Sequence, residues 1–238
     1  MIAVRQKPCE KNIRQEFITA HDMMRPGGFG LTRRAISFCP FSPGDRIADI
    51  GCGSGSSVDL LKEEFGLKAL GVDLKAESGI SISNTSSFIR GNAERLPFKP
   101  ESLDGVMAEC SLSVLKNKDD ALSEFARVLR SGGFLMVTDV YGRAPEAIIM
   151  IDELPFCMSG IMTKQGLTQA LCTCGLITKV FEDHSQLLNE FVARMIMEHG
   201  SLKSFCNCGT STSADLAKKM MLFRQARPGY FMLIAQKI

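Results

Sequence analysis

The sequence has no excess of charge of either sign and no long apolar run. Its 28 lysines and arginines are balanced by 26 aspartates and glutamates, which leaves a net charge of +2 at pH 7. A nucleic-acid-binding surface needs concentrated positive charge, so we expect no nucleic-acid partner. No segment approaches the roughly 18 consecutive apolar residues of a membrane-spanning helix, so we expect no membrane insertion.

The sequence also lacks the features of a secreted, disulfide-stabilised protein. Its first residues, MIAVRQKPCEKNIRQEF, have no apolar core of the kind found in secretory signals, so a cytoplasmic location is expected. The nine cysteines are odd in number and scattered over 238 residues. A chain of this length can bury a large core without covalent staples, so we expect reduced thiols.

What the sequence does contain is an alternation of strand-like and helix-like segments, with no internal repeat and no linker. Apolar runs that end in turn residues predict strands, at 46–50, 68–73, 87–93, 102–110, 134–140, 176–181 and 230–235. Apolar residues at helical spacing predict helices, at 10–24, 31–39, 56–65, 75–85, 117–130, 163–174, 186–199 and 214–227. Residues 143–160 and 201–213 are expected to be irregular. The alternation predicts an α/β fold with a parallel sheet covered on both faces.

Three helix ends carry recognisable capping signals. Ser56 or Ser57 is the expected N-cap of the helix that follows the first strand, and Gly66 is its expected C-cap. Asn117, followed three residues later by Asp120, resembles a capping box with aspartate in place of glutamate.

A glycine-rich turn follows the first predicted strand. Residues 49–55 read DIGCGSG, and glycines there let a ligand approach the backbone at the N-terminus of the next helix. Asp73 ends the second strand, where its carboxylate can accept both hydroxyls of a ribose. The dinucleotide pattern G-x-G-x-x-G is not met, because Ser56 holds its third glycine position. The turn therefore indicates an adenosine-type ligand and argues against a nicotinamide-dependent oxidoreductase.

Together with later segments, this turn resembles the class I S-adenosylmethionine-dependent methyltransferases of small-molecule type. The resemblance is carried by six segments in order: IADIGCGSG (47–55), GVD (71–73), GNAERLPF (91–98), SLDGVMAECSLSVL (102–115), EFARVLRSGGFLMVTDV (124–140) and PGYFMLIAQK (228–237). It implies a three-layer Rossmann-like sandwich whose seven strands follow the order 3-2-1-4-5-7-6, with the last strand antiparallel. It also implies one domain over residues 1–238, with an N-terminal helical cap at 1–40 and acceptor-side elements at 143–174 and 185–227.

The resemblance also implies a reaction and a set of site residues. A methyl group would pass from S-adenosylmethionine to a small-molecule acceptor by in-line displacement, which leaves S-adenosylhomocysteine. The residues expected to bind the cofactor are Asp49, Gly51, Cys52, Gly53, Asp73, Leu74, Asn92, Ala93, Glu94 and Glu109. The family usually has aspartate where this chain has Asn92, whose side-chain carbonyl can still accept from an adenine amino group.

No single residue is required to catalyse such a transfer, since the sulfonium leaving group is already activated. A general base is needed only for an acceptor that keeps its proton, and the candidates are Glu109, Tyr141 and His184. No metal site is expected, although Cys157, Cys172, Cys174, Cys206 and Cys208 gather in the C-terminal half. A non-catalytic protein that binds the cofactor or a metal is therefore the alternative. Neither the acceptor atom nor the oligomeric state follows from the sequence.

Overall fold

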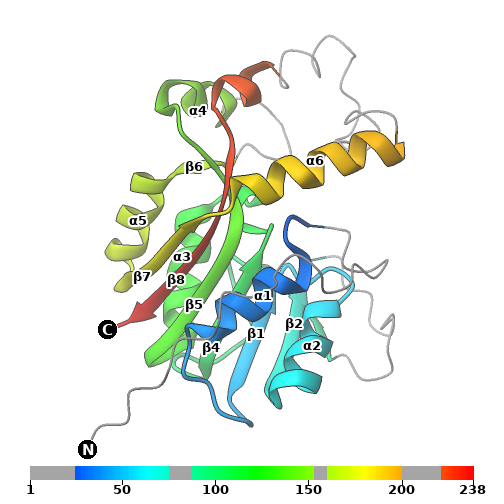
Figure 1. Ribbon diagram of the computed structural model, residues 1–238. Helices are drawn as coiled ribbons and strands as arrows, with labels where there is room; N and C mark the ends of the chain where they lie inside the picture. Colours follow the sequence, from blue (N-terminus) through cyan, green and yellow to red (C-terminus); the bar gives the residue numbers. More distant parts are fainter. Residues whose placement is uncertain (1–24, 75–86, 153–159, 200–220) are drawn as a thin grey trace, which may run out of the picture.

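A single twisted sheet organises our computed structural model, which describes residues 25–74, 87–152, 160–199 and 221–238 (Figure 1). The strands follow the order β3-β2-β1-β4-β5-β8-β7, and the short β6 pairs with the end of β5. Their bounds are β1 Arg46–Ile50, β2 Lys68–Asp73, β3 Phe88–Arg90, β4 Leu103–Glu109, β5 Leu129–Gly142, β6 Met162–Thr163, β7 Leu176–Asp183 and β8 Gly229–Lys237.

The strand directions agree with the sequence expectation. Strands β3, β2, β1, β4 and β5 pair in parallel, whereas β8 runs antiparallel to both β5 and β7. If β6 is set aside, this is the predicted order 3-2-1-4-5-7-6 with its last strand antiparallel, so the α/β Rossmann-like fold is confirmed. Strand β6 is an eighth strand that the sequence did not predict, because two residues are too few to show an alternating pattern.

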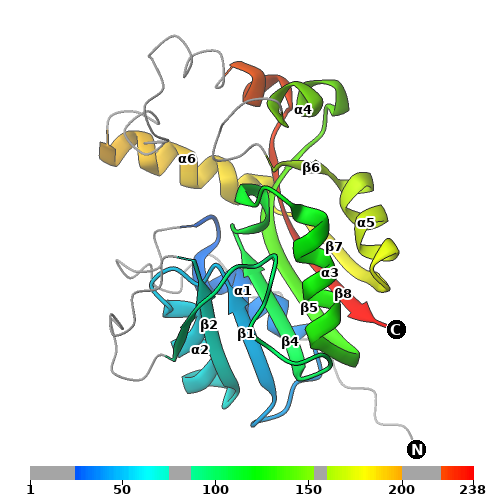
Figure 2. The same cartoon turned by 180° about the vertical axis from the view of Figure 1, so that it is seen from behind.

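Helices cover both faces of this sheet (Figures 1 and 2). Their bounds are α1 Gly28–Ser37, α2 Ser56–Phe65, the 3-10 helix η2 Leu112–Val114, α3 Lys118–Val128, α4 Pro145–Asp152, α5 Lys164–Thr173 and α6 Ser185–His199. One buried cluster joins the sheet to α3 and α5 through side chains such as Phe125 and Leu171. A second cluster joins it to α1, α2 and α6 through side chains such as Ile36, Leu61 and Leu188.

The middle of the sheet is buried on both faces, as parallel sheets of this architecture require. In β1 every residue after Arg46 is buried, and in β8 the first seven residues are buried. The continuous apolar run of β8, from Tyr230 to Ala235, reflects its place between β5 and β7. Burial on both faces therefore explains why these strands show continuous rather than alternating hydrophobicity.

Helix ends follow backbone geometry more than side-chain caps. The N-cap of α2 is Gly55 with φ 82°, so neither Ser56 nor Ser57 caps the helix as expected. Gly66 is the C-cap with φ 65°, as predicted. Asn117 is the N-cap residue of α3 but makes no side-chain cap hydrogen bond; its amide donates instead to Glu94 Oε2 at 3.3 Å. The competing carboxylate explains why the predicted capping box is wrong.

Some expectations differ from the structure or lie outside the described residues. Residues 145–152, expected to be irregular, form α4, whose Pro145 stands at the first helical position, where proline is favoured. Strand β5 begins at Leu129, earlier than expected, because Gly132 and Gly133 lie within it. The expected helices at 10–24 and 75–85 and the loop at 201–213 lie outside the described ranges, as does the first half of the expected helix at 214–227. In its second half, residues 221–225 are helical.

The carboxyl end of the parallel strands faces the region of α4 and α6 (Figure 1). The N-terminal end of α1 reaches α6, since a Cβ built on Gly27 would lie 2.9 Å from Leu187 Cδ1. In open α/β sheets this end of the strands is where ligands bind. Within the described ranges, every helix is too short or too polar to cross a bilayer.

Candidate functional site

The glycine-rich turn between β1 and α2 has a backbone that mainly glycine tolerates. Gly51, Gly53 and Gly55 all have positive φ, at 77°, 53° and 82°. A Cβ on Gly51 would lie 2.6 Å from Ser111 Cβ, and one on Gly55 would lie 2.1 Å from Phe88 Cζ. Around Gly53, in contrast, no heavy atom of the described residues other than its chain neighbours lies within 4 Å of the position of a Cβ. The turn is therefore packed at its two ends and open at its centre.

The Asp73 carboxylate lies directly against this open centre. The Gly53 N–H donates to Asp73 Oδ2 at 3.0 Å, and the Gly51 N–H donates to the Val72 carbonyl at 2.7 Å. These two hydrogen bonds fasten the turn to the end of β2. The sequence-predicted glycines and the predicted acid are thus brought together by the pairing of β1 with β2.

Asp49 is buried beneath the turn, at the penultimate position of β1. It is 3% exposed. Burial, reinforced by the negative charge of Glu109, raises the pKa of Asp49 from 3.8 to about 8, while Arg25 opposes the shift. The side chain therefore holds a proton near neutral pH until a positive charge approaches it.

Glu109, the last residue of β4, is the centre of a buried polar cluster. Its Oε2 pairs with Arg25 Nη2 at 3.0 Å and accepts from Ser57 Oγ at 3.0 Å. Its Oε1 accepts from Thr32 Oγ1 at 2.8 Å. The cluster thus links the end of β4 to Ser57 in α2, to Thr32 in α1, and to Arg25, which lies just before α1. With both oxygens engaged, Glu109 acts here as an anchor for the N-terminal segment.

Cys110 continues from β4 in a left-handed conformation, with φ 52°. Its N–H donates to the Thr138 carbonyl at 2.8 Å, and its Sγ lies 3.0 Å from Tyr230 Oη. Burial raises the pKa of the Cys110 thiol to about 12, so it stays protonated and unreactive. Burial likewise raises the pKa of Cys52, within the glycine turn. Neither thiol is therefore a ready nucleophile or metal ligand.

The residues expected to hold adenine lie in the segment after β3, which local hydrogen bonds hold in a turn. Asn92 Oδ1 accepts the Glu94 N–H at 3.0 Å, and Glu94 Oε1 accepts the Asn117 N–H at 3.2 Å. Ala93 is buried, whereas Leu74, just after β2, is 62% exposed. The Asn92 carbonyl is thus already engaged locally, so a bound adenine amino group would have to share it.

Two of the three candidate bases are engaged at the end of β7. The Tyr141 hydroxyl donates to Asp183 Oδ2 at 2.8 Å and accepts from Arg143 Nε at 3.1 Å, and burial raises the pKa of Tyr141. His184 Nε2 lies 2.9 Å from Glu182 Oε2, which Arg34 also holds. Among the contacts of the described residues, none joins Tyr141 or His184 to the glycine turn. Glu109 alone of the three candidates borders it.

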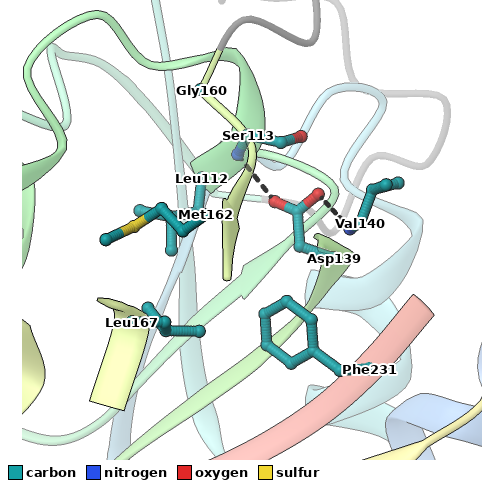
Figure 3. Close-up of a pocket in the computed structure, with 8 residues that line it drawn as sticks. All are labelled: Leu112, Ser113, Asp139, Val140, Gly160, Met162, Leu167 and Phe231. Carbon is teal, nitrogen blue, oxygen red and sulfur yellow. Dashed lines mark hydrogen bonds between the residues drawn. The ribbon is translucent and has the colours of Figure 1, made fainter. Parts of the chain in front are cut away.

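A small cavity lies beside the carboxyl ends of β4 and β5 (Figure 3). Asp139 projects toward it, and its two oxygens accept the Ser113 N–H at 2.8 Å and the Val140 N–H at 2.7 Å. The lining also includes residues of η2, β6, α5 and β8 and a glycine just before β6: Leu112, Met162, Leu167, Phe231 and Gly160. With both oxygens engaged, Asp139 fixes η2 against β5.

The cysteines of the C-terminal half assemble no metal centre in the ranges that the structure covers. No group of three or more histidine, cysteine, aspartate or glutamate side chains able to hold a metal occurs there. Cys172 is exposed, and Cys174 Sγ lies 3.6 Å from Ser123 Oγ. Cys157, Cys206 and Cys208 lie outside the described residues.

Sequence reasoning did not identify the partners of Glu109. Arg25 lies in a turn sequence, Arg25-Pro26-Gly27-Gly28, Thr32 lies on a helix face without a local pattern that marks it, and Ser57 was expected only as a helix cap. Their convergence depends on α1 and α2 packing side by side against the sheet, which only the three-dimensional arrangement reveals. A glutamate at the end of a buried strand indicates that polar partners must surround it, because burying an unpaired charge costs much free energy.

Comparison with known proteins shows which proteins this chain resembles. The family model of the methyltransferase domain matches residues 48–137, from β1 to β5. An O-methyltransferase of Aspergillus sclerotiorum, resE, is 30% identical over 166 residues, 64% of this chain and 62% of that protein. An arsenite methyltransferase of Halobacterium salinarum is 28% identical over 152 residues, 58% of this chain and 39% of that protein.

The solved structure of the cyclase SpnF has the same fold, with a TM-score of 0.71 at 22% identity, covering 92% of this chain and 85% of that one. The matches span only 29% to 51% of the length of three curated relatives. The sheet, the glycine turn with its Asp73 partner, and the match to the methyltransferase domain over residues 48–137 together make this an α/β fold similar to that of the S-adenosylmethionine-dependent methyltransferases.

Proposed function

We propose that this protein transfers a methyl group from S-adenosylmethionine to a small-molecule acceptor. The observation that carries the proposal is the glycine turn. Its centre at Gly53 is open, and the Asp73 carboxylate borders it, with Asp73 Oδ2 at 3.0 Å from the Gly53 nitrogen. A nucleoside with a short, non-phosphorylated substituent fits such a turn, because the turn offers backbone N–H groups and a ribose-binding acid.

The residues of the site suit this cofactor. Gly51, Cys52 and Gly53 would border its methionine portion, and Asp73 would accept the ribose hydroxyls. Leu74 offers an exposed apolar side chain next to Asp73, as expected of a contact with the adenine ring. The remaining proposed contacts lie at the ends of β1 and β4 and in the segment after β3: Asp49, Asn92, Ala93, Glu94 and Glu109.

The chain's own contribution to catalysis would be orientation. When bound, S-adenosylmethionine supplies a methyl group on a positively charged sulfur that is already a good leaving group. Holding two reactants in line can contribute about 7–11 kcal/mol of barrier reduction. Glu109, Tyr141 and His184 stay candidates for a general base, and the engaged state of all three favours an acceptor that needs none.

A small-molecule acceptor is supported by the relatives and by charge. The similar proteins are named for different acceptors, arsenite and an oxygen acceptor among them, and the net charge of +2 is not the strong positive charge typical of nucleic-acid-binding proteins. The elements proposed for the acceptor side are 143–174 and 185–227, which follow β5 and β7 at the carboxyl end of the sheet.

The test is calorimetric titration with S-adenosylhomocysteine. We expect binding in the micromolar range, weakened at least about 10-fold in Asp73→Ala, because a buried charge-assisted hydrogen bond is worth about 1.5–3 kcal/mol. Asp119→Ala, which removes an exposed aspartate in the first turn of α3, is the matched control and should bind normally.

Two outcomes would contradict the proposal. Binding of NADH without binding of S-adenosylhomocysteine would make the site that of an oxidoreductase. Binding of S-adenosylhomocysteine without methyl transfer to any member of a broad acceptor panel, including thiols, arsenite, amines and carboxylic acids, would indicate a cofactor-binding protein with another activity. The similarity to SpnF, named as a cyclase, makes this separate measurement of methyl transfer necessary.

A further inference from the structure

The 3-10 helix η2 connects the proposed cofactor turn to the elements proposed for the acceptor side. Ser111, directly before η2, packs against Gly51, on which a Cβ would lie 2.6 Å from Ser111 Cβ. On the acceptor side, the Gly160 N–H donates to the Ser113 carbonyl of η2 at 2.9 Å. Strand β6 begins two residues after Gly160 and pairs with the end of β5. A shift of η2 would therefore change how the two sides of the site face each other.

Little within η2 itself fixes its position. It has only three residues, and its N-cap, Ser111, makes no side-chain cap hydrogen bond. The hydrogen bonds inside a 3-10 helix have poor geometry, so a helix this short depends on tertiary contacts. For η2 these contacts come from Asp139 in β5 and from Gly160, which are both distant from it in sequence.

Asp139 holds the N–H side of the Ser113 peptide (Figure 3). Its carboxylate accepts the Ser113 N–H at 2.8 Å and the Val140 N–H at 2.7 Å, and the residue is 1% exposed. Burial raises the pKa of Asp139, although hydrogen bonds from backbone N–H groups oppose the shift. A buried acid is costly where the surrounding cavity is mostly apolar. Its presence indicates that the position of η2 matters for more than stability.

Gly160 holds the carbonyl side of the same peptide. A Cβ on Gly160 would lie 2.8 Å from the Ser113 carbonyl carbon and 3.1 Å from the Leu115 carbonyl oxygen. Only a residue without a side chain lets the two backbones approach this closely. Asp139 and Gly160 thus fix η2 through the two polar groups of one residue, Ser113.

We propose that Asp139 and Gly160 are positioning residues for methyl transfer, which hold η2 so that a bound acceptor stands in line with the cofactor. Among the contacts of the described residues, none joins Asp139 or Gly160 to the glycine turn. Their effect should therefore fall on the transfer step more than on cofactor binding. In-line geometry tolerates little displacement, since a shift of about 1 Å can lower a rate about 100-fold. This inference rests on the proposed function.

The test measures cofactor binding and methyl transfer separately in variants of Asp139. Calorimetry gives the Kd for S-adenosylhomocysteine, and kinetics use an acceptor of the panel above that the unmodified protein methylates. Asp139→Leu offers no accepting oxygen and should lower kcat at least about 10-fold. The KM for S-adenosylmethionine and the Kd for S-adenosylhomocysteine should each stay within about 3-fold of the unmodified values. Asp139→Asn keeps one accepting oxygen and should retain more activity than Asp139→Leu.

Gly160→Ala tests the same role from the carbonyl side of Ser113. The added methyl group would push the two backbones apart without altering any acid. This variant should show the same separation, with a lower kcat and near-normal cofactor binding. It serves as the second variant where Asp139→Leu does not fold, which circular dichroism establishes.

Matched controls change residues of the same types near the amino end of β4. Asp104→Leu removes a carboxylate that accepts the Arg46 N–H at 2.8 Å. Gly105→Ala places a methyl group 2.8 Å from Phe41 Cζ. Both controls should lower the temperature of thermal unfolding and leave kcat and the Kd for S-adenosylhomocysteine unchanged.

Three outcomes would overturn the positioning role alone. They are an unchanged kcat in folded Asp139→Leu and Gly160→Ala, an equal loss of kcat in the controls, and a loss of S-adenosylhomocysteine affinity as large as the loss of kcat. In each case the unmodified protein still transfers a methyl group, so the proposed function stands. Failure of the unmodified protein to bind S-adenosylhomocysteine, or to methylate any acceptor, overturns the proposed function and the positioning role with it.

Discussion

At the scale of single residues, the site holds two acids in different surroundings. Glu109 pairs with Arg25 and accepts hydrogen bonds from the hydroxyl groups of Thr32 and Ser57. Asp49 is buried more completely, and burial raises its pKa to about 8. The apoprotein therefore carries a protonated carboxyl beside the glycine turn, which makes both stability and ligand binding depend on pH.

Asp49→Asn should stabilise the ligand-free protein at neutral and alkaline pH. The unfolded chain releases the Asp49 proton near pH 4, whereas the folded protein keeps it up to about pH 8, so unmodified protein loses stability as pH rises between these values. Asparagine does not ionise, and the variant should be more stable by on the order of a few kcal/mol at pH 8 and equally stable near pH 4.

Urea unfolding of both proteins at several pH values measures this difference. Parallel loss of stability in the two proteins between pH 4 and pH 8 would contradict the raised pKa. The same variant should bind S-adenosylmethionine more weakly, because it offers no negative charge to a cationic ligand. A residue that destabilises the free protein and improves binding would be typical of a functional site.

At the scale of elements, two glycines of the same turn are expected to affect different properties when substituted. Gly53→Ala should mainly weaken ligand binding, and Gly55→Ala should mainly lower the stability of the fold. Gly53→Ala places a methyl group in open space, at a cost of about 1–2 kcal/mol for the left-handed backbone. We expect a folded protein whose affinity for S-adenosylhomocysteine falls at least about 10-fold, because the methyl group occupies the space proposed for the ligand. Circular dichroism and calorimetry together measure the two effects.

Gly55→Ala is the contrasting variant within the same turn. Its methyl group would lie 2.1 Å from Phe88 Cζ, in a backbone with φ 82°. We expect the free energy of unfolding to fall by about 2–4 kcal/mol, because strain and overpacking act together. The protein that stays folded should bind with near-normal affinity. Equal loss of affinity in both variants would show that the open space at Gly53 has no special role.

Elements were predictable from the sequence where one physical cause dominated. The glycine turn and Asp73 were found because chain spacing and strand pairing bring them together. The capping box at Asn117 was predicted wrongly, because the Asn117 side chain donates instead to Glu94, which is 23 residues away in the sequence. Arg25 as a partner of Glu109 could not be predicted, because 84 positions separate two residues that meet only after α1 packs on the sheet. Local patterns therefore identify elements, and distant contacts complete the site.

At the scale of the whole molecule, β8 joins the edge strand β7 to β5 and so to the rest of the sheet. It pairs with β5 along eight residue positions and with β7 along seven, and its side chains from Tyr230 to Ala235 are fully buried. Removal of residues 229–238 should therefore abolish cooperative unfolding, whereas removal of Ile238, which is 73% exposed, should leave it intact. Calorimetric scanning of both truncated proteins checks this; a cooperative transition without β8 would contradict its central role.

The strand order was predictable because the six segments of the family resemblance fix the order of the strands. The cover on the carboxyl end of the sheet was less predictable. Helix α4 was expected to be irregular, since it has only eight residues and its apolar residues are consecutive, which gives no helical face that periodicity could identify. Local sequence patterns thus predict the core strands of the fold. They do not predict the elements proposed to contact an acceptor.

The placement of β8 has a consequence for how the chain is made. During synthesis, β1 to β5 leave the ribosome first and can pair at once, whereas β7 has no neighbour until β8 follows it. Until then the outer side of β5 is an unpaired strand edge, a template for pairing with other chains. In the nascent protein, the strands that carry the proposed cofactor site can therefore pair before β8 and β7 complete the sheet. Ligand present in the cell at that moment would stabilise the half-made molecule against aggregation.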